Sequence, residues 1–191
     1  LINVRDVCSN PDVITGLECA AAEGLVEKTK GSYRFSHDMI QKAVDDYIEP
    51  NGRQKMLLEL AETLLKRTGE DRDDAVLFII VDFVNRVGPN PNFVSSADKR
   101  ARYAALNLRA GEKASIVPDY KSVCEYVESG INFLGEDNWK PNHYHLSLAL
   151  FKHAAIGQWA LGNTTLMSDR INEVCHKAKV FEDKLEVLDV L

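Results

Sequence analysis

Apolar residues recur at helical spacing near the start of the chain, and the pattern then changes to that of strands. In residues 12–25 they fall three or four positions apart, as on one face of an α-helix: Val13, Ile14, Leu17, Ala20, Ala21 and Leu25. Gly24 is the residue expected to end this helix. Residues 25–28 and 33–35 then resemble two short strands joined by a turn at 29–32, which predicts a β-hairpin.

A second helix is predicted directly after the hairpin. Ser36 is its expected N-cap, and the helix runs to about Ile48, where Pro50, Asn51 and Gly52 end it. Helix, hairpin and helix in this order are the layout of a winged-helix domain. We therefore expect such a domain in residues 1–50.

The pattern after Gly52 is helical throughout. One amphipathic stripe predicts a helix there: Met56, Leu57, Leu60, Ala61, Leu64 and Leu65. A loop at 68–73 separates it from a helix over about 74–87. Residues 88–92, Gly-Pro-Asn-Pro-Asn, are the strongest break in the chain. Residues 51–92 are accordingly interpreted as linking helices and residues 93–191 as a further domain.

Helices are expected in this last domain at about 97–114, 119–134, 144–161, 165–178 and from 182 onward. They pair into helical hairpins similar to tetratricopeptide repeats. Gly111 stands where such a repeat has its small residue, and a second copy runs through Ala155, Gly162, Met167, Ile171 and Val174. The period from Gly111 to Ala155 is 44 residues instead of 34, which indicates an insertion around 135–141. The predicted fold class is mainly α, with one β-hairpin before a helical array.

The composition of the chain argues against several classes of function. The net charge of −6 argues against a nucleic-acid-binding surface. No apolar run approaches the roughly 20 residues that span a bilayer. The four cysteines, Cys8, Cys19, Cys124 and Cys175, form no C-x-x-C pair, which fits free thiols in the cytoplasm. The chain starts without Met and stops inside an apparent helix, so we expect it to be part of a longer protein.

His37 and Asp38 are the main candidates for chemistry. They lie at a strand-to-helix junction, and a helix start offers free N–H groups and a positive dipole end to an anion such as a phosphate. His37 would then face a phosphate while Asp38 stabilises the first turn. The alternative is that Asp38 only bonds first-turn amides and His37 packs under the hairpin.

The other patterns in the sequence do not indicate a catalytic or metal-binding site. Residues 77–82, Leu-Phe-Ile-Ile-Val-Asp, imitate the strand whose Asp holds magnesium in P-loop ATPases, but Phe83 follows Asp82 and the chain has no Gly-Lys dipeptide. The apolar residues of this region suit a buried helix face instead: Val76, Leu77, Ile80, Val81 and Val84. Four histidines lie in the array, and no acid or cysteine completes a metal cluster with them: His143, His145, His153 and His176. We expect no metal site and no catalysis in this segment.

Two groups of side chains suggest partners. The positive residues of the hairpin region could meet DNA, nucleotide phosphates or an acidic domain, or simply be solvated: Lys28, Lys30, Arg34 and Lys42. The aromatic residues of the array are expected mainly in its core: Tyr120, Tyr126, Phe133, Trp139, Phe151 and Trp159. The inner face of a stacked array also commonly binds proteins.

The residues 24–26 and 33–43 together resemble a known family. The run Tyr-Arg-Phe-Ser-His-Asp-Met-Ile-Gln-Lys-Ala is similar to the winged-helix end of signal-transduction ATPases with numerous domains, the STAND class, in forms attached to serine/threonine kinases or hybrid sensor histidine kinases. Residues 105–114 and the pattern from Tyr120 to Trp139 resemble the helical region that follows the ATPase there. The resemblance covers nearly the whole chain.

The resemblance implies a regulated ATPase switch. In relatives with a Met-His-Asp motif the histidine contacts the β-phosphate of ADP; His37 and Asp38 match that pair, and Ser36 replaces the Met. Arg34 is a further candidate for nucleotide contact. ATP or ADP with Mg would be bound mainly by residues outside this segment, and the repeats would bind a protein partner or the effector domain. Two alternatives are a DNA-binding regulator with a helical sensor and a pure protein-interaction scaffold.

Overall fold

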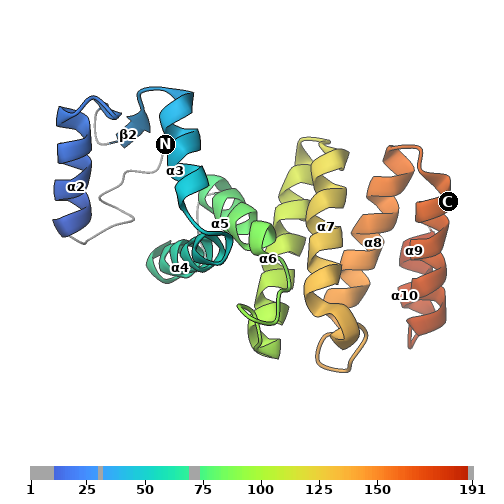
Figure 1. The fold of residues 1–191 in the computed structure, drawn as a ribbon. Helices are drawn as coiled ribbons and strands as arrows, with labels where there is room; N and C mark the ends of the chain where they lie inside the picture. Colours follow the sequence, from blue (N-terminus) through green and yellow to red (C-terminus); the bar gives the residue numbers. More distant parts are fainter. Residues whose placement is uncertain (1–10, 30–31, 69–73, 189–191) are drawn as a thin grey trace. The chain divides into compact units, whose positions relative to one another are not determined.

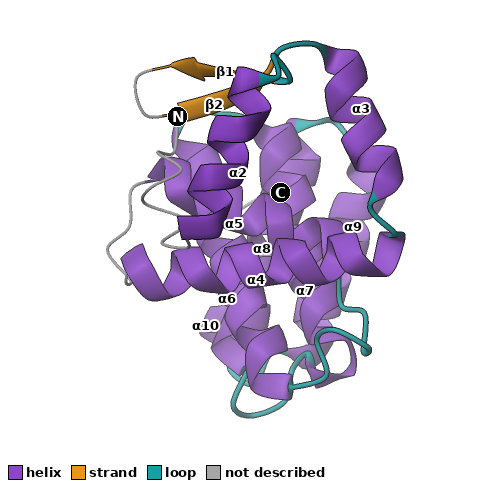
Figure 2. Cartoon of the chain, turned by 60° about the vertical axis from the view of Figure 1, so that its left-hand side comes forward, coloured by secondary structure: helices purple, strands orange, loops and turns teal. Residues whose placement is uncertain are grey.

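The computed structural model describes residues 11–29, 32–68 and 74–188. These residues form helices and a single antiparallel β-hairpin (Figures 1 and 2), which confirms the predicted mainly α fold class. Contacts divide the chain into two compact units, Leu1–Thr68 and Gly69–Leu191. The linking segment expected at 51–92 contributes one helix to each unit, and its separate status stays a prediction.

The first unit begins with α2 (Pro11–Ala22), and the chain reverses directly after it. Gly24 has φ +73°, a left-handed conformation that favours glycine, and its N–H donates to the Ala21 carbonyl at 3.1 Å. β1 (Val26–Thr29) then pairs antiparallel with β2 (Ser32–Phe35), with Val26 opposite Phe35. In Figure 1 this hairpin lies between α2 and α3 (Asp38–Tyr47). The tip of the predicted turn, residues 30–31, lies outside the described residues.

The second helix of this unit begins one residue later than its sequence predicts. Ser36 is not the N-cap, because its N–H donates to the Leu25 carbonyl at 3.1 Å and continues the hairpin. His37 occupies the N-cap position instead, with extended φ −144° and ψ 143°. α3 ends at Tyr47, and Pro50 begins the next helix, α4 (Pro50–Thr68). Proline is well suited to a first helical turn, because N–H groups there have no hydrogen-bond acceptor within the helix and proline lacks the N–H.

Little of the segment before α4 is buried. Of the described residues from 12 to 49, only Val26 is buried, and α3 has no buried residue. Met39 is 79% exposed and Tyr47 is 89% exposed. α4 differs, since four of its apolar residues are buried: Leu57, Ala61, Leu64 and Leu65.

The second unit is a series of helices that pack in chain order (Figure 1). They are α5 (Asp74–Val87), α6 (Ala97–Ile116), α7 (Tyr120–Leu134), α8 (Tyr144–Ala160), α9 (Thr164–Lys177) and α10 (Phe181–Leu188). Each helix packs on the next one in the chain, and α8 also contacts both α6 and α10. The helical hairpins predicted for residues 97–178 are therefore present.

Three glycines set the close approach of neighbouring helices in this array. A Cβ added to Gly111 would lie 2.8 Å from Val127 Cγ1, and one added to Gly130 would lie 2.7 Å from Leu150 Cδ2. A Cβ on Gly157 would lie 2.6 Å from Cys124 Sγ. Gly162, a position of the second predicted repeat copy, follows the end of α8 in a left-handed conformation (φ +76°) with open space around it.

The segment predicted as an insertion connects α7 to α8 and is anchored by an aromatic side chain. Trp139 Nε1 donates to Glu173 Oε1 at 3.1 Å, and its ring centre lies 5.1 Å from that of Phe151. Phe133 and Phe151 are buried as expected. Trp159, also expected mainly in the core, is 57% exposed in the last turn of α8. Its position at the helix end, beyond the contact at Gly157, explains this exposure.

Candidate functional site

His37 lies at the open start of α3. Its side chain is exposed and makes no capping hydrogen bond to the helix, while its carbonyl accepts from the N–H groups of Ile40 and Gln41 at 3.0 and 3.3 Å. The backbone hydrogen bond between Ser36 and Leu25 fixes the entry into this helix. The imidazole at this site is therefore free to meet a ligand or a partner surface.

Asp38 occupies the first position of the same helix and is exposed. An acid in the first turn interacts favourably with the positive end of the helix dipole. It also places a negative charge where an anion would approach, so it would compete with a phosphate unless it turns toward solvent. Asp38 thus has a sufficient structural role, and His37 is the stronger candidate for ligand contact.

The positive residues around the hairpin are largely paired with acids. Lys28 Nζ lies 3.3 Å from Glu18 Oε1, and Arg34 Nε donates to Glu27 Oε2 at 2.7 Å across the hairpin. Hydrogen bonds to Glu18 and Tyr33 raise the pKa of Lys28. Lys42 is exposed, and Lys30 lies outside the described residues. Because Lys28 and Arg34 are partly neutralised, the described part of the hairpin offers a weak surface for DNA.

Arg34 is not brought to His37 by any contact between described side chains. Its guanidinium bonds Glu27, and its side chain remains 74% exposed. Contact with a phosphate would require Arg34 to leave or share that acid. The three predicted nucleotide-contacting residues thus lie close in sequence, but in this structure they do not form one hydrogen-bonded cluster.

The strand-like run at 77–82 is helical, which confirms its interpretation as a buried helix face. Leu77, Ile80 and Val81 in α5 are fully buried. Asp82 points to solvent and pairs with Arg86 one turn later, at 3.0 Å. Its carboxylate has the ordinary role of a surface helix charge.

The array histidines have different local surroundings. His143 is the N-cap of α8 and makes no capping bond, and His176 Nδ1 lies 2.7 Å from the Asn172 carbonyl. His153 is mostly buried, and burial lowers its pKa against the opposing effect of Glu112, 3.9 Å away. Within residues 11–29, 32–68 and 74–188, no three His, Cys, Asp or Glu side chains form a group able to hold a metal ion.

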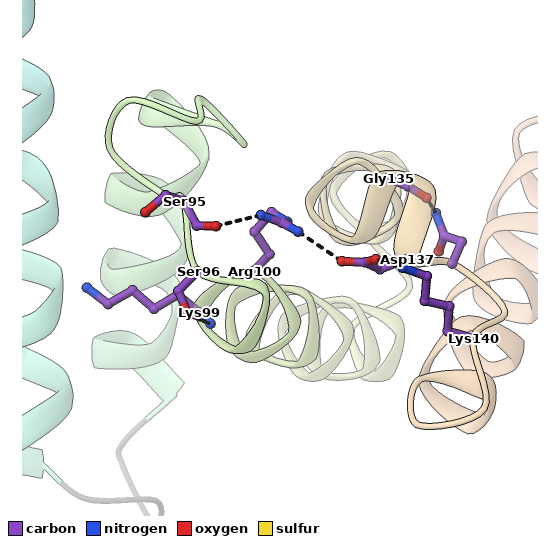
Figure 3. A network of polar contacts seen from close by, with 8 residues as sticks. Ser95, Ser96, Lys99, Arg100, Gly135, Asp137 and Lys140 are labelled. Atoms are coloured by element: carbon purple, nitrogen blue, oxygen red, sulfur yellow. Dashed lines mark hydrogen bonds and ion pairs between the residues drawn. The ribbon is translucent and has the colours of Figure 1, made fainter.

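The structure also contains a groove that the sequence did not predict. It has a volume of about 480 Å³ and lies where the loop between α5 and α6 meets the end of α7 and the short 3₁₀ helix η1 (Gly135–Asp137). Arg100 crosses one wall, donating to the Ser95 carbonyl at 3.0 Å and to Asp137 Oδ2 at 2.9 Å (Figure 3). The other carboxylate oxygen of Asp137, Oδ1, accepts a hydrogen bond from Lys140 Nζ.

The sequence carries only a weak signal for this groove. Residues 88–92 and 135–141 were both identified as breaks between helices, but they lie far apart in the chain. The pairing of Arg100 with Asp137, which brings them together, spans 37 residues. No local pattern predicts such a contact.

None of the helices in the described part of the chain is long and apolar enough to cross a membrane. Comparison of the chain with protein-family models, with curated proteins and with solved structures found no match.

Proposed function

We propose that this chain is a non-catalytic regulatory segment of a multidomain, cytoplasmic STAND-type signalling ATPase, linked to a protein kinase. His37 senses the bound nucleotide, and the helical array binds a protein partner or the effector domain. The observation that carries the proposal is the exposed, uncapped position of His37 at the start of α3. The sequence run around it, which resembles the STAND winged helix, supplies the class.

The physical basis is the differential binding of two nucleotides. An imidazole and the first-turn N–H groups of α3 would donate to a phosphate of ADP held by residues outside this segment. ADP would favour the closed arrangement because it binds that arrangement more tightly, and ATP, with its different phosphate positions, would release it. Mg would accompany the nucleotide and also lie outside this segment.

The array supports the second half of the proposal. Its helices stack side by side in chain order, and such arrays present extended surfaces to proteins. An acidic chain of net charge −6 with a mostly neutralised hairpin favours a protein partner over nucleic acid. The array would thus transmit the nucleotide state to a partner.

The test compares His37→Ala with His143→Ala in the intact multidomain protein. Both histidines occupy N-cap positions without a capping bond, but His143 begins α8 in the array. Loss of a charge-assisted hydrogen bond should speed ADP dissociation by about ten- to a hundredfold in His37→Ala, since such a bond is worth about 1.5–3 kcal/mol. His143→Ala should leave dissociation unchanged.

The measurement is the release of a fluorescent ADP analogue after mixing with excess ADP, together with basal output of the effector. Faster release in His37→Ala alone, with raised basal output, supports the latch. Equal release rates in His37→Ala and in the unaltered protein would contradict it and leave α3 with a purely structural role.

A further inference from the structure

The exposed apolar residues of α3 form a stripe along one side of the helix. Met39, Ala43 and Tyr47 follow one another at intervals of four residues, so they lie on one face. Tyr47 and Met39 are the two most exposed large apolar side chains in the described part of the chain. An amphipathic helix ordinarily turns such a stripe toward the core. Because α3 has no buried residue, its stripe is open to another molecule.

A line of charged residues borders this stripe. Asp38, Lys42 and Asp46 are also spaced four residues apart, and Lys42 and Asp46 each follow a stripe residue by three positions, which makes them its neighbours on the helix surface. Glu49 follows two residues after the end of α3. All four side chains are exposed, and none forms a hydrogen bond or ion pair with another described side chain.

The charges beside the stripe do not cancel. Asp45 is neutralised by Arg53, whose Nη2 lies 3.5 Å from its Oδ1. Lys28 and Arg34 of the hairpin are likewise each paired with an acid. Lys42 therefore faces the three acids of the border by itself, which gives the border a net charge of −2. A surface that covers the stripe has to supply positive charge to complement it.

This combination of apolar and acidic residues selects among the surfaces able to cover α3. Helices that lie on membranes have a polar face rich in Lys and Arg, and the acidic border of α3 is repelled by anionic lipid. The phosphates of nucleic acid repel it in the same way. A second copy of the chain would add the same net charge from its own side of the contact. A protein surface with apolar residues beside Lys or Arg complements both features.

We infer that α3 docks against an amphipathic helix of a partner protein, whose apolar stripe is flanked by Lys or Arg. A partner helix places apolar residues every three or four positions, the spacing that packs against Met39, Ala43 and Tyr47. Tyr47 supplies the largest apolar contact, and the basic flank of the partner meets Asp46 and Glu49. A helix of ten residues offers a small surface, so the association is weak and reversible.

The inference goes beyond the proposed function, since it assigns a partner surface to α3 and not to the array. It does not rest on the nucleotide contact, because His37 precedes the helix and is not part of the stripe. His37→Ala should bind the partner helix as well as the unaltered chain does. Each proposal can therefore fail while the other stands.

The experiment titrates the isotope-labelled chain with two acetylated, amidated peptides. One is Lys-Leu-Lys-Lys-Leu-Leu-Lys-Lys-Leu-Lys-Lys-Leu-Leu-Lys, which places its leucines on one helical face, and the other has Glu at every Lys. The lysine peptide should shift the amide signals of residues 38–49, with an affinity that falls as salt is added. The glutamate peptide keeps the apolar face and should bind at least about tenfold more weakly, because like charges oppose the contact.

Two pairs of variants assign the contact to the stripe and to its border. Tyr47→Ala should weaken binding of the lysine peptide at least about fivefold, whereas Phe181→Ala, at an exposed aromatic residue on α10, should not. Asp46→Asn should weaken it about two- to fivefold, whereas Asp169→Asn, at an exposed acid on α9, should not. Asp46→Asn removes no apolar contact, so it tests the inference even where Tyr47→Ala lowers helix content.

Four results would each overturn the inference. They are equal affinity of the two peptides, amide shifts confined to residues outside 38–49, equal losses of affinity in a variant and its control, and self-association of the chain that Tyr47→Ala abolishes. The last would assign the stripe to a second copy. Sedimentation of the unaltered chain and of Tyr47→Ala over a range of concentrations measures it.

Discussion

The helix–hairpin–helix segment of residues 11–49 and the array of α6–α9 use their apolar residues in opposite ways. In the first, only Val26 is buried among the described residues, and Met39 and Tyr47 are largely exposed. In the second, Ala104, Val127 and Leu150 are completely buried, and glycines let the helices approach closely. Both segments contain many apolar residues, but those of the array are packed against neighbouring helices and those of the first segment are mostly exposed.

This difference indicates which region contributes most to folding stability and which has apolar surface available to bind another molecule. Each buried apolar side chain contributes about 1.5–3 kcal/mol to folding, so the array holds itself together. The exposed apolar side chains of α3 contribute little to folding, and contiguous exposed apolar surface marks an interaction site. We therefore expect another surface to cover the segment that carries His37, as the proposed function requires.

The largest expected effect comes from truncating one apolar side chain in each region. Leu150→Ala should lower the free energy of unfolding of the array by about 2–5 kcal/mol, because the residue is fully buried and its neighbours cannot fill the space. Tyr47→Ala, at a residue 89% exposed, should change stability by no more than about 0.5 kcal/mol.

Urea denaturation followed by tryptophan fluorescence measures Leu150→Ala, since both tryptophans, Trp139 and Trp159, lie in the array. Circular dichroism follows Tyr47→Ala. A loss of less than about 1 kcal/mol for Leu150→Ala would mean that the array is loosely packed. A large loss for Tyr47→Ala would mean that α3 is buried in solution.

A second test applies one substitution, glycine to alanine, to both regions and expects opposite signs. Gly130→Ala places a Cβ against Leu150 Cδ2 and 3.2 Å from the Ala104 carbonyl oxygen, so overpacking of about 1–3 kcal/mol should outweigh the gain in helix propensity. Gly16→Ala in α2 meets no atom within 4 Å and should stabilise that helix by about 0.5–1 kcal/mol.

Amide hydrogen exchange measures the stability change caused by each substitution, because it reports the protection of each region of the chain separately. Gly130→Ala should speed exchange in α7 and α8, and Gly16→Ala should slow it in α2. Stabilisation by both substitutions would show that the α7–α8 contact has room for a methyl group. The two substitutions would then change stability in the same direction, and the proposed contrast in packing between the two regions would be contradicted.

The fold was largely readable from local patterns. Helical spacing in residues such as Leu77 and Val81 marks a buried face, and the turn chemistry at Gly24 marks the entry to the hairpin. An error arose at the start of α3, where one residue type suits two roles. Ser36 is a good N-cap residue, but its N–H donates to the Leu25 carbonyl and so continues the hairpin.

The sites were less predictable, because they depend on contacts between distant residues. The position of His37 at a helix start follows from the local sequence, but its exposure and lack of a capping bond do not. The groove depends on the pairing of Arg100 with Asp137, and the anchoring of Trp139 by Glu173 spans 34 residues. Such pairings follow from how helices stack, which periodicity alone does not determine.

The smallest expected effect concerns pH and again separates the two regions. Burial on α8 lowers the pKa of His153 below its usual 6.5; Glu112 opposes this shift, and Lys152 adds to it. The unfolded chain therefore binds a proton more readily at this site, so the array should lose stability as the pH falls through 6.5 toward the lowered pKa. The hairpin's Lys28, whose pKa is raised, stays charged over this range and adds no such dependence.

The measurement compares the urea midpoints of the unaltered chain and of His153→Gln at about pH 7.5 and pH 5.5, the range in which histidine titrates. The glutamine keeps a polar side chain without the titration, so His153→Gln should show the smaller drop between the two pH values. An equal drop in both proteins would mean that Glu112, 3.9 Å away, fully offsets the burial of the imidazolium. In that case the array would tolerate a charge at this half-buried position, and its contrast with the exposed N-terminal segment would rest on apolar packing alone.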